Sequence, residues 1–331
     1  MKVFEVTAGS SGIDGLARAE RPDPSPGPYE VLVRMRAASL NYRDLAVVSG
    51  KYFAGPVERN TIPLSDGAGQ VEAVGERVRD FAVGDRVVAT FTQGRPAGAL
   101  GHPLDGVLTE LAVFDEQGLL PIPGDLSFEE AATLPCAGVT AWNALTEGKR
   151  VRPGDTVLTL GTGGVSLFAV QLAKAAGAHV IITSSSDEKL ERAKALGADE
   201  LINYKTREDW DQAVMELTGG AGADHVIELG GAGTLPQSYR AVAQSGEISL
   251  IGVLTPPAGH LSPHPLMFKG ATLRGIFVGG RELFVGLNKA VAVNGIRPVI
   301  DSVFEFDAAP EAFRYLQAAK HVGKVVIKIP G

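Results

Sequence analysis

The sequence predicts an α/β protein in which a doubly wound parallel sheet is joined to an N-terminal domain built as a small, partly closed β-barrel. Two patterns lead to this prediction. From about residue 157 to 278, strand-like runs alternate with segments of helical length, as parallel strands joined by crossover helices require. The first third instead holds short alternating strands separated by turn residues. A length of 331 residues is enough for two such domains.

The strands expected in the first domain are short and end at glycine, proline or aspartate. Residues 1–6 alternate in polarity as a strand does, and the run Pro-Ser-Pro-Gly-Pro at 24–28 forms the first clear turn. Further strands are expected at residues 31–36, 69–74, 86–89 and 107–113. Where this region ends, Ser127 is placed to cap a helix that starts with two glutamates.

The second domain is predicted from six strands and the helices between them. The strands are expected at residues 157–160, 180–183, 201–203, 225–228, 248–251 and 273–278. The connecting helices are expected at residues 166–176, 188–196, 208–217 and 235–243. Helices at 283–293 and 310–320 and a last strand at 325–329 are expected to return to the first domain.

The composition excludes several classes of protein. With 45% hydrophobic residues the chain can fill packed cores, and its net charge of −7 is opposite to that of a nucleic-acid binder. One cysteine, Cys136, excludes an internal disulfide and any site of four thiolates. No uninterrupted apolar run approaches the roughly 18 residues of a membrane span, and the N-terminus lacks the apolar core of a signal peptide. We therefore expect a cytoplasmic protein that acts on a small molecule.

Residues 161–166, Gly-Thr-Gly-Gly-Val-Ser, have the composition and position of a dinucleotide-binding turn. They follow the strand predicted at 157–160 and precede an amphipathic helix. Gly161 allows the tight turn, while Gly163 and Gly164 have no Cβ to keep a diphosphate away from the backbone. The N–H groups of Val165 and Ser166 lie in the first turn of the predicted helix, whose positive end favours phosphate. The motif departs from G-x-G-x-x-G because Ser166 replaces the last glycine, and a glycine-rich turn with no ligand remains the alternative.

The end of the second strand favours NADP(H) over NAD(H). In NAD enzymes of this fold an acidic residue about 20 residues after the turn binds the ribose 2′-hydroxyl. Here that strand ends in Ser184, Ser185 and Ser186, and the first acids fall beyond it, where they would begin a helix. Hydroxyl groups together with Lys189 suit a 2′-phosphate, which a carboxylate would repel. A capped helix with a solvated lysine is the alternative.

The order of motifs resembles the medium-chain dehydrogenase/reductase superfamily, and within it the zinc-free quinone oxidoreductase-like branch. The motifs are residues 38–45 (ASLNYRDL), 63–69 (PLSDGAG), 83–87 (VGDRV), 134–142 (LPCAGVTAW), 161–166, 176–178, 196–199 and 323–326. The resemblance implies a catalytic, chaperonin-10-like (GroES-like) domain of residues 1–124 and 280–331. It also implies a Rossmann coenzyme domain of residues 125–279, a cleft between the two, and a homodimer formed through the edge strand at 273–278.

The resemblance also bears on zinc. In the alcohol dehydrogenase branch three protein ligands hold a catalytic zinc, and the matching positions here are Asn41, Ser65 and Cys136. Only the cysteine is a usual zinc ligand, and Asp66, which matches an acid beside the zinc, does not complete a site that needs three donors. His102, His260 and His264 show no ligand spacing. We expect no metal.

The remaining site residues are assigned by the resemblance. Tyr52 matches a tyrosine that donates a proton or anchors a carbonyl in related enoyl reductases, and Asn41 would hydrogen-bond the cofactor carboxamide or the acceptor. A tyrosine packed in a barrel loop is the alternative for Tyr52. Further cofactor contacts are expected from Thr140, Tyr204, Gly230, Ile251, Gly252, Phe277, Val278 and Lys324, in addition to the glycine turn and the residues Ser184, Ser185 and Lys189.

Without a metal, activation of an alcohol is difficult, whereas reduction of an electrophilic acceptor needs only position and hydrogen bonds. We therefore expect a zinc-independent oxidoreductase that transfers hydride from NADPH to a quinone or an α,β-unsaturated carbonyl compound. An alcohol or carbonyl dehydrogenase with a degenerate metal site is the first alternative. A non-catalytic NADPH-binding protein is the second.

Overall fold

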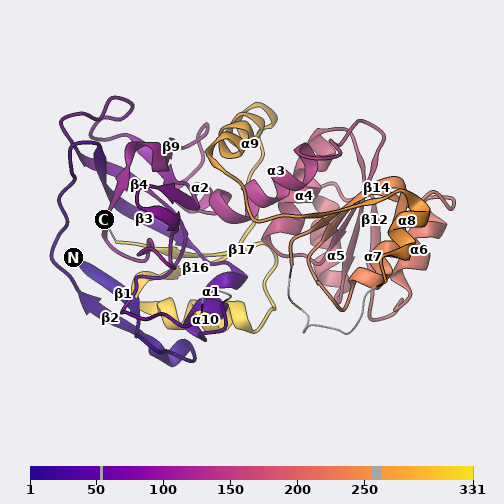
Figure 1. Ribbon diagram of the computed structural model, residues 1–331, viewed down its shortest axis with the longest axis horizontal. Coiled ribbons are helices and arrows are strands. Elements are labelled where there is room, and N and C mark those ends of the chain that lie inside the picture. The colour runs from indigo at the N-terminus through magenta and orange to yellow at the C-terminus, as the bar shows by residue number, and fades with distance from the viewer. Residues whose placement is uncertain (53–54, 253, 255–261, 331) are drawn as a thin grey trace. The chain divides into compact units, whose positions relative to one another are not determined.

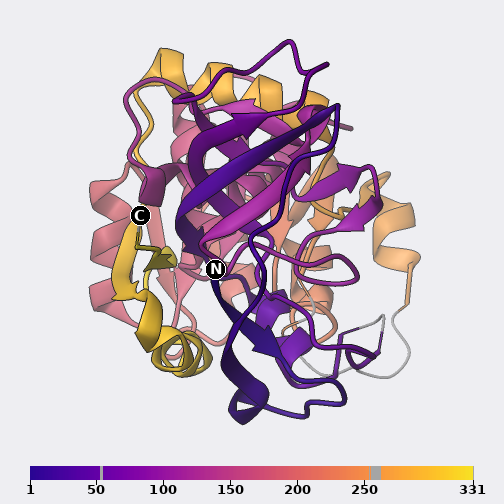
Figure 2. The ribbon, with the colours of Figure 1, turned by 90° about the vertical axis from the view of Figure 1, so that its left-hand side faces the viewer.

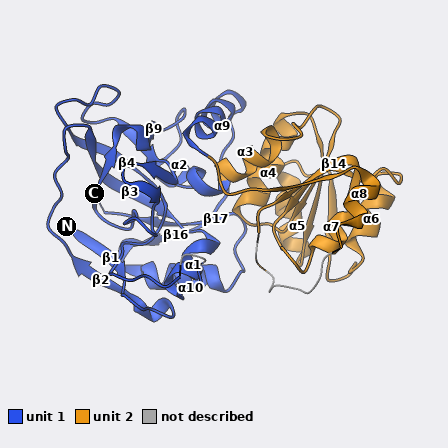
Figure 3. Ribbon diagram, in the orientation of Figure 1, with its two compact units in different colours: residues 1–137, 280–331 blue, residues 138–279 orange. Residues whose placement is uncertain are grey.

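The computed structural model describes residues 1–52, 55–252, 254 and 262–330, and these fall into two compact units. Unit 1 comprises Met1–Ala137 and Gly280–Gly331, and unit 2 comprises Gly138–Gly279 (Figure 3). Both ends of the chain belong to unit 1 (Figure 1 and Figure 2). Across the described residues, no helix is long and apolar enough to span a bilayer.

The first boundary differs from the one expected after residue 124, because residues 125–137 pack with unit 1. Helix α2 (Phe128–Ala131) contacts strands β3 and β4 of that unit. Ser127 caps this helix as predicted, since its hydroxyl accepts from the Glu130 N–H while the Glu130 carboxylate accepts from the Ser127 N–H. Further along, the Cys136 N–H donates to Asp66 in β4.

Unit 1 is built around a seven-stranded sheet in the order β16-β17-β3-β4-β5-β9, with β8 paired to β3. These strands are β3 (Glu30–Ser39), β4 (Asp66–Val74), β5 (Arg86–Ala89), β8 (Leu111–Asp115), β9 (Leu119–Pro121), β16 (Ile300–Glu305) and β17 (Lys324–Lys328). Only β16 and β17 run parallel to each other; the remaining pairs are antiparallel. Two small hairpins accompany the sheet: β1 (Lys2–Val6) with β2 (Leu16–Glu20), and β6 (Thr92–Gly94) with β7 (Ala97–Ala99).

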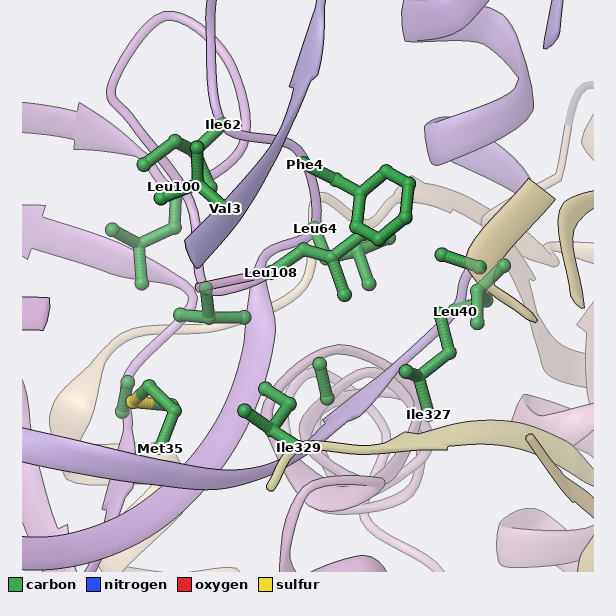
Figure 4. Close-up of a cluster of buried hydrophobic side chains, with 14 of the residues drawn as sticks. Val3, Phe4, Met35, Leu40, Ile62, Leu64, Leu100, Leu108, Ile327 and Ile329 are labelled. Atoms are coloured by element: carbon green, nitrogen blue, oxygen red, sulfur yellow. The ribbon is translucent and has the colours of Figure 1, made fainter. Parts of the chain in front are cut away.

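Most strands predicted for this unit are present, with one shift along the chain. The strand expected at 107–113 is β8 and starts at Leu111, because Val107 and Leu108 instead donate to the carbonyl of Pro63. The helices of unit 1 are α1 (Tyr42–Val48), α2, α9 (Arg281–Asn294) and α10 (Ala309–Gln317). Buried apolar side chains from β1, β3 and β17 meet the loops at residues 62–64 and 100–108 in one core (Figure 4).

Unit 2 contains a parallel six-stranded sheet in the order β12-β11-β10-β13-β14-β15. Its strands are β10 (Thr156–Leu160), β11 (His179–Ser184), β12 (Glu200–Asn203), β13 (Ala223–Glu228), β14 (Val242–Leu250) and β15 (Thr272–Gly275). Its helices are α3 (Val139–Thr146), α4 (Gly164–Ala175), α5 (Asp187–Ala195), α6 (Trp210–Leu217), α7 (Leu235–Ala241) and α8 (His264–Lys269). Helices α3 and α4 pack together, and α6, α7 and α8 form a second group.

This strand order reverses between β10 and β13, which is the topological switch point where doubly wound sheets bind ligands. The prediction of a doubly wound parallel sheet is therefore confirmed. The predicted ends of two strands were wrong. β14 ends at Leu250, before Ile251, and β15 ends at Gly275, before Phe277 and Val278. Val278 has φ +51°, a left-handed conformation outside the extended region that strand residues ordinarily adopt.

Candidate functional site

The glycine turn connects β10 to α4 in unit 2. Gly161 has φ +78°, which favours glycine, and its N–H donates to the Thr183 carbonyl of the neighbouring strand. Gly163 is the N-cap residue of α4 and has no side chain to cap the helix. A Cβ added at Gly161 or Gly163 would meet no atom within 4 Å. The space over this corner is therefore open to a ligand.

Ser166 explains how the turn tolerates the loss of its third glycine. Its side chain is buried, and its hydroxyl donates to the carbonyl of Leu160, the last residue of β10, at 2.8 Å. The serine thus joins helix to strand where the usual motif has no side chain. The N–H groups of the first turn of α4, which includes Gly164 and Val165, have no partner within the helix and suit an anion.

The end of β11 carries hydroxyl groups rather than a carboxylate. Ser184 is the last residue of the strand and is buried, whereas Ser185 is exposed. Ser186 caps α5 by accepting from the Lys189 N–H, which places Lys189 in the first turn of that helix. Asp187 also lies in this first turn, as the sequence predicted, together with the acid that follows it.

Tyr204 lies beside Ser184, because its N–H donates to the Ser184 carbonyl at 3.0 Å. The Asp187 carboxylate accepts from the Asn203 side chain at 2.7 Å. The acid nearest the end of β11 is therefore engaged with the residue before Tyr204. The structure brings Ser184 and Tyr204 together, and their contact with a 2′-phosphate stays a prediction.

Glu228 was predicted only as the end of a strand, yet it organises the loop that follows β13. Its side chain is fully buried. The carboxylate accepts from the N–H groups of Gly230 and Gly231 at 2.8 and 3.0 Å and from the hydroxyl of Thr234 at 2.5 Å. The Ser238 hydroxyl also donates to it. Four donors on one buried carboxylate fix the loop that carries Gly230.

The loop after β14 is joined to the same anchor. The N–H groups of Ile251 and Gly252 donate to the Glu228 carbonyl at 3.0 and 3.1 Å. A Cβ at Gly252 would lie 1.6 Å from the Leu229 carbonyl oxygen, so only glycine fits there. Gly230, Ile251 and Gly252 therefore form one assembly at the carboxyl edge of the sheet, where a bound dinucleotide is expected.

The last predicted cofactor residues of unit 2 differ in exposure. Thr140 is buried in α3, and Val278 is 8% exposed, whereas Phe277 is 60% exposed. His264 opens α8 and is exposed, while His260 lies outside the described residues.

In unit 1, Asn41 and Lys324 lie in one buried polar cluster. Asn41 caps α1, because its N–H donates to the Asp44 carboxylate at 2.7 Å. The ammonium of Lys324, only 4% exposed, donates to the Leu40 carbonyl at 2.6 Å and to Oδ1 of Asn41. Nδ2 of Asn41 is buried and meets no acceptor at hydrogen-bond geometry.

Asp66 completes this cluster. Its fully buried carboxylate accepts from the Ser65 hydroxyl at 2.6 Å and from the Cys136 N–H at 3.0 Å. Burial raises the pKa of Asp66, while the charge of Lys324 acts against the shift. Burial likewise raises the pKa of Asp44 to about 6. Burial raises the pKa of the Cys136 thiol, and the charge of Asp66 raises it further.

These residues do not fit a catalytic zinc. The three positions that match zinc ligands carry an amide (Asn41), a hydroxyl (Ser65) and a single thiol (Cys136), whereas a catalytic zinc needs three protein donors. The ammonium of Lys324 lies in the same cluster and would repel a dication. Among the residues that the structure describes, no group of three or more His, Cys, Asp or Glu could hold a metal ion.

Tyr52 lies in an aromatic group around Arg43. The guanidinium carbon of Arg43 is 4.9 Å from the ring centre of Tyr52 and 4.8 Å from that of Phe91. Nε of Arg43 donates to the Tyr52 hydroxyl at 3.3 Å, and its other nitrogens donate to the carbonyls of Leu100 and His102. Arg43 therefore fixes the tyrosine oxygen as an acceptor of one hydrogen bond. Sequence reasoning missed Arg43, although it stands in the motif at 38–45.

Family models match both parts of the chain. An alcohol dehydrogenase GroES-like domain matches residues 27–124, and a zinc-binding dehydrogenase domain matches residues 164–292. The zinc-type alcohol dehydrogenase-like protein C1773.06c of Schizosaccharomyces pombe is 47% identical over an alignment of 335 positions that covers 96% of each chain. The chain is a medium-chain dehydrogenase/reductase.

Other members of this superfamily carry several names. A quinone oxidoreductase of Pseudomonas aeruginosa is 37% identical over 265 residues, covering 80% of this chain and 77% of its own. A solved NAD-dependent alcohol dehydrogenase has a TM-score of 0.93 at 36% identity and full coverage of both chains. The mycobacterial protein Rv1454c, solved with NADPH, has a TM-score of 0.84 at 31% identity and 99% coverage of both.

The prediction of a GroES-like domain together with a Rossmann domain is confirmed by these matches. As a medium-chain dehydrogenase/reductase, the chain is an oxidoreductase of a superfamily that binds nicotinamide cofactors. Its relatives include both quinone oxidoreductases and alcohol dehydrogenases.

Proposed function

We propose that this medium-chain dehydrogenase/reductase reduces a quinone or an α,β-unsaturated carbonyl compound with NADPH, without a metal. The observation that carries the proposal is the polar cluster of unit 1. At the positions that match zinc ligands it holds Asn41, Ser65 and Cys136, of which only the last is a usual zinc ligand, and it contains a buried ammonium, Lys324. An alcohol substrate would need a stronger electrophile to lose its proton.

The glycine turn and the end of β11 fit NADPH. The diphosphate would lie over Gly161, Gly163 and the first turn of α4, where added side chains find open space. The 2′-phosphate would meet the hydroxyls of Ser184 and Ser185, with Lys189 and Tyr204 from the neighbouring elements. No carboxylate ends β11, and Asp187 is engaged with Asn203. The NADPH bound to one solved relative supports the same choice.

When bound, the reduced nicotinamide supplies a hydride, that is, two electrons and the hydrogen that forms the new C–H bond. The acceptor oxygen then gains negative charge. Nδ2 of Asn41, which is buried beside the Asp66 carboxylate, or the hydroxyl of Tyr52 would stabilise this charge. The proton that completes the product would come from Tyr52 or from water.

We also propose a homodimer in which β15 of one protomer pairs with β15 of its partner. In the described part of the sheet β15 has β14 as its only neighbour, so one edge of the strand remains for pairing.

A spectrophotometric screen of NADPH oxidation tests the function, with quinones, enones, enals and ketones as acceptors and metal analysis of the same sample. We expect turnover with quinones or activated double bonds and less than 0.1 equivalent of zinc, with no loss of rate in chelator. The alternative, an alcohol or carbonyl dehydrogenase, is favoured by the name of the 47% identical relative. Stoichiometric zinc with chelator-sensitive alcohol oxidation would establish that alternative. NADPH binding without turnover across the panel would establish a non-catalytic binding protein.

A further inference from the structure

The backbone at Val278 adopts a conformation that its side chain disfavours. Val278 has φ +51°, in the left-handed region, where a β-branched side chain crowds its own backbone. Four non-glycine residues of the described chain have positive φ, and Val278 is the β-branched one among them. It lies three residues beyond the end of β15, so the chain turns sharply where the sheet ends. Such a conformation persists only where the surroundings hold it.

Asn143 of α3 holds it. Nδ2 of Asn143 donates to the Val278 carbonyl at 2.6 Å. The guanidinium of Arg274, on β15, donates to Oδ1 of Asn143 at 2.9 Å and to its backbone carbonyl at 2.9 Å. Because Arg274 engages the oxygen of the side-chain amide, the nitrogen must face Val278. Asn143 is therefore fixed in one orientation.

Arg274 is itself held by a buried carboxylate. Its Nε donates to Oε1 of Glu247 at 2.8 Å, and Glu247 is 3% exposed. Oε2 of Glu247 accepts from the Lys149 N–H at 2.9 Å. The carboxylate, the guanidinium and the amide thus form a continuous set of hydrogen bonds from β14 to Val278. This set of residues, Glu247, Arg274 and Asn143, is called the Asn143 clamp below.

We propose that Asn143 is a positioning residue of the reductase, which holds the Val278 backbone against the reactive ring of the cofactor. The proposal rests on the proposed function and on the cofactor contacts that the family resemblance implies for Phe277 and Val278. A left-handed turn at Val278 aims the peptide groups after β15 differently from a strand. An error of about 1 Å at such a position lowers a hydride transfer rate by up to about 100-fold. Asn143 itself need touch neither cofactor nor acceptor.

The variant Asn143→Asp separates the two contacts of the clamp. An aspartate keeps an oxygen for Arg274, but it places a second oxygen against the Val278 carbonyl, where the wild type has a donor. Asn288→Asp is the matched control, because Asn288 also lies on a helix and its Nδ2 also donates to a backbone carbonyl, that of Pro121, at 3.2 Å. Both variants are measured with the same acceptor, taken from the screen above.

We expect Asn143→Asp to lower kcat at least tenfold and to raise the primary isotope effect of 4-deuterated NADPH, while the Kd of NADPH changes less than threefold. The control should change kcat less than twofold. If Asn143 only stabilises the fold, Asn143→Asp will lower Tm and leave kcat and the isotope effect of the folded enzyme unchanged. That result would overturn the proposal. A wild-type enzyme that oxidises no NADPH refutes the proposed function instead, and the role of Asn143 in it.

The conformation of Val278 is tested without activity. Val278→Ala and Val278→Gly both remove the valine side chain, and at an ordinary buried position the alanine variant melts higher. In a left-handed conformation glycine is favoured, so we expect Val278→Gly to melt about 2–4 °C above Val278→Ala. When Asn143→Asp is added, we expect Val278→Ala to melt above Val278→Gly, because the backbone at residue 278 is then free to relax. Alanine melting higher in both backgrounds would show that no clamp exists.

Discussion

Replacement of the turn glycine, Gly163→Val, separates ligand binding from folding. Gly163 has φ −79° and ψ −175°, which valine adopts readily, and a Cβ there meets no atom within 4 Å. The side chain would instead occupy the space of the diphosphate. If two N–H contacts to charged oxygens are lost, at roughly 1.5–3 kcal/mol each, the Kd of NADPH rises by at least about 100-fold. NADH should lose a similar factor, because both cofactors share the diphosphate.

The control for this experiment is Gly280→Val. Gly280 is the N-cap residue of α9, with φ −81°, ψ 179° and open space at its Cβ, so the substitution has the same intrinsic cost without the turn. Titration of NADPH fluorescence gives Kd, and thermal unfolding without cofactor gives Tm. The two variants should share one small decrease in Tm. A Gly163→Val protein that binds NADPH within threefold of wild type would show that this corner does not hold the diphosphate.

Three further variants test the cofactor pocket and the buried charges. Lys189→Ala should raise the KM of NADPH about tenfold more than that of NADH, and equal changes in steady-state assays would mean that Lys189 does not meet the 2′-phosphate. Glu228→Gln leaves one acceptor oxygen for four donors. The free energy of unfolding, measured in urea, should therefore fall by about 2–4 kcal/mol, and the KM of NADPH should rise. Unchanged values of both would contradict the role of Glu228 as an anchor. The pKa of Asp44, raised by burial from 3.8 to about 6, means that the folded state holds its proton longer than the unfolded state. The stability that Asp44 contributes is therefore complete below pH 4 and lost by pH 6, a difference of about 3 kcal/mol, and Asp44→Asn should remove this part of the pH dependence of Tm; an unchanged profile would exclude Asp44 as its source.

The fold was predictable because its signals are local. Strand-helix alternation identified all six strands of the unit 2 sheet, and the glycine turn marked the first crossover. Errors fell at strand ends, where long-range contacts decide. β15 was extended through Val278 because a run of apolar residues continues past Gly275, whereas the Asn143 clamp turns the chain there.

The candidate site was less predictable, because the residues that organise it bind backbone groups. The sequence predicted Glu228 only as the end of a strand, whereas in the structure its carboxylate accepts hydrogen bonds from four donors. Asn143 lies within a helix, where an asparagine carries no signal of its own. Cofactor contact by Lys324 stays a prediction; the structure places its ammonium against Leu40 and Asn41.

The position of Lys324 determines which atom of the Asn41 side chain is available in the site that we propose to work without a metal. A buried amide such as Asn41 can present either its oxygen or its nitrogen to a ligand, and a dehydrogenase that must stabilise an oxyanion needs the nitrogen. The ammonium of Lys324 engages Oδ1, so the nitrogen of the same amide is directed to the side of the Asp66 carboxylate. Arg274 engages Oδ1 of Asn143 in the same manner and directs its nitrogen to Val278. In each unit, therefore, a cation on a β-strand orients a side-chain amide by engaging its oxygen.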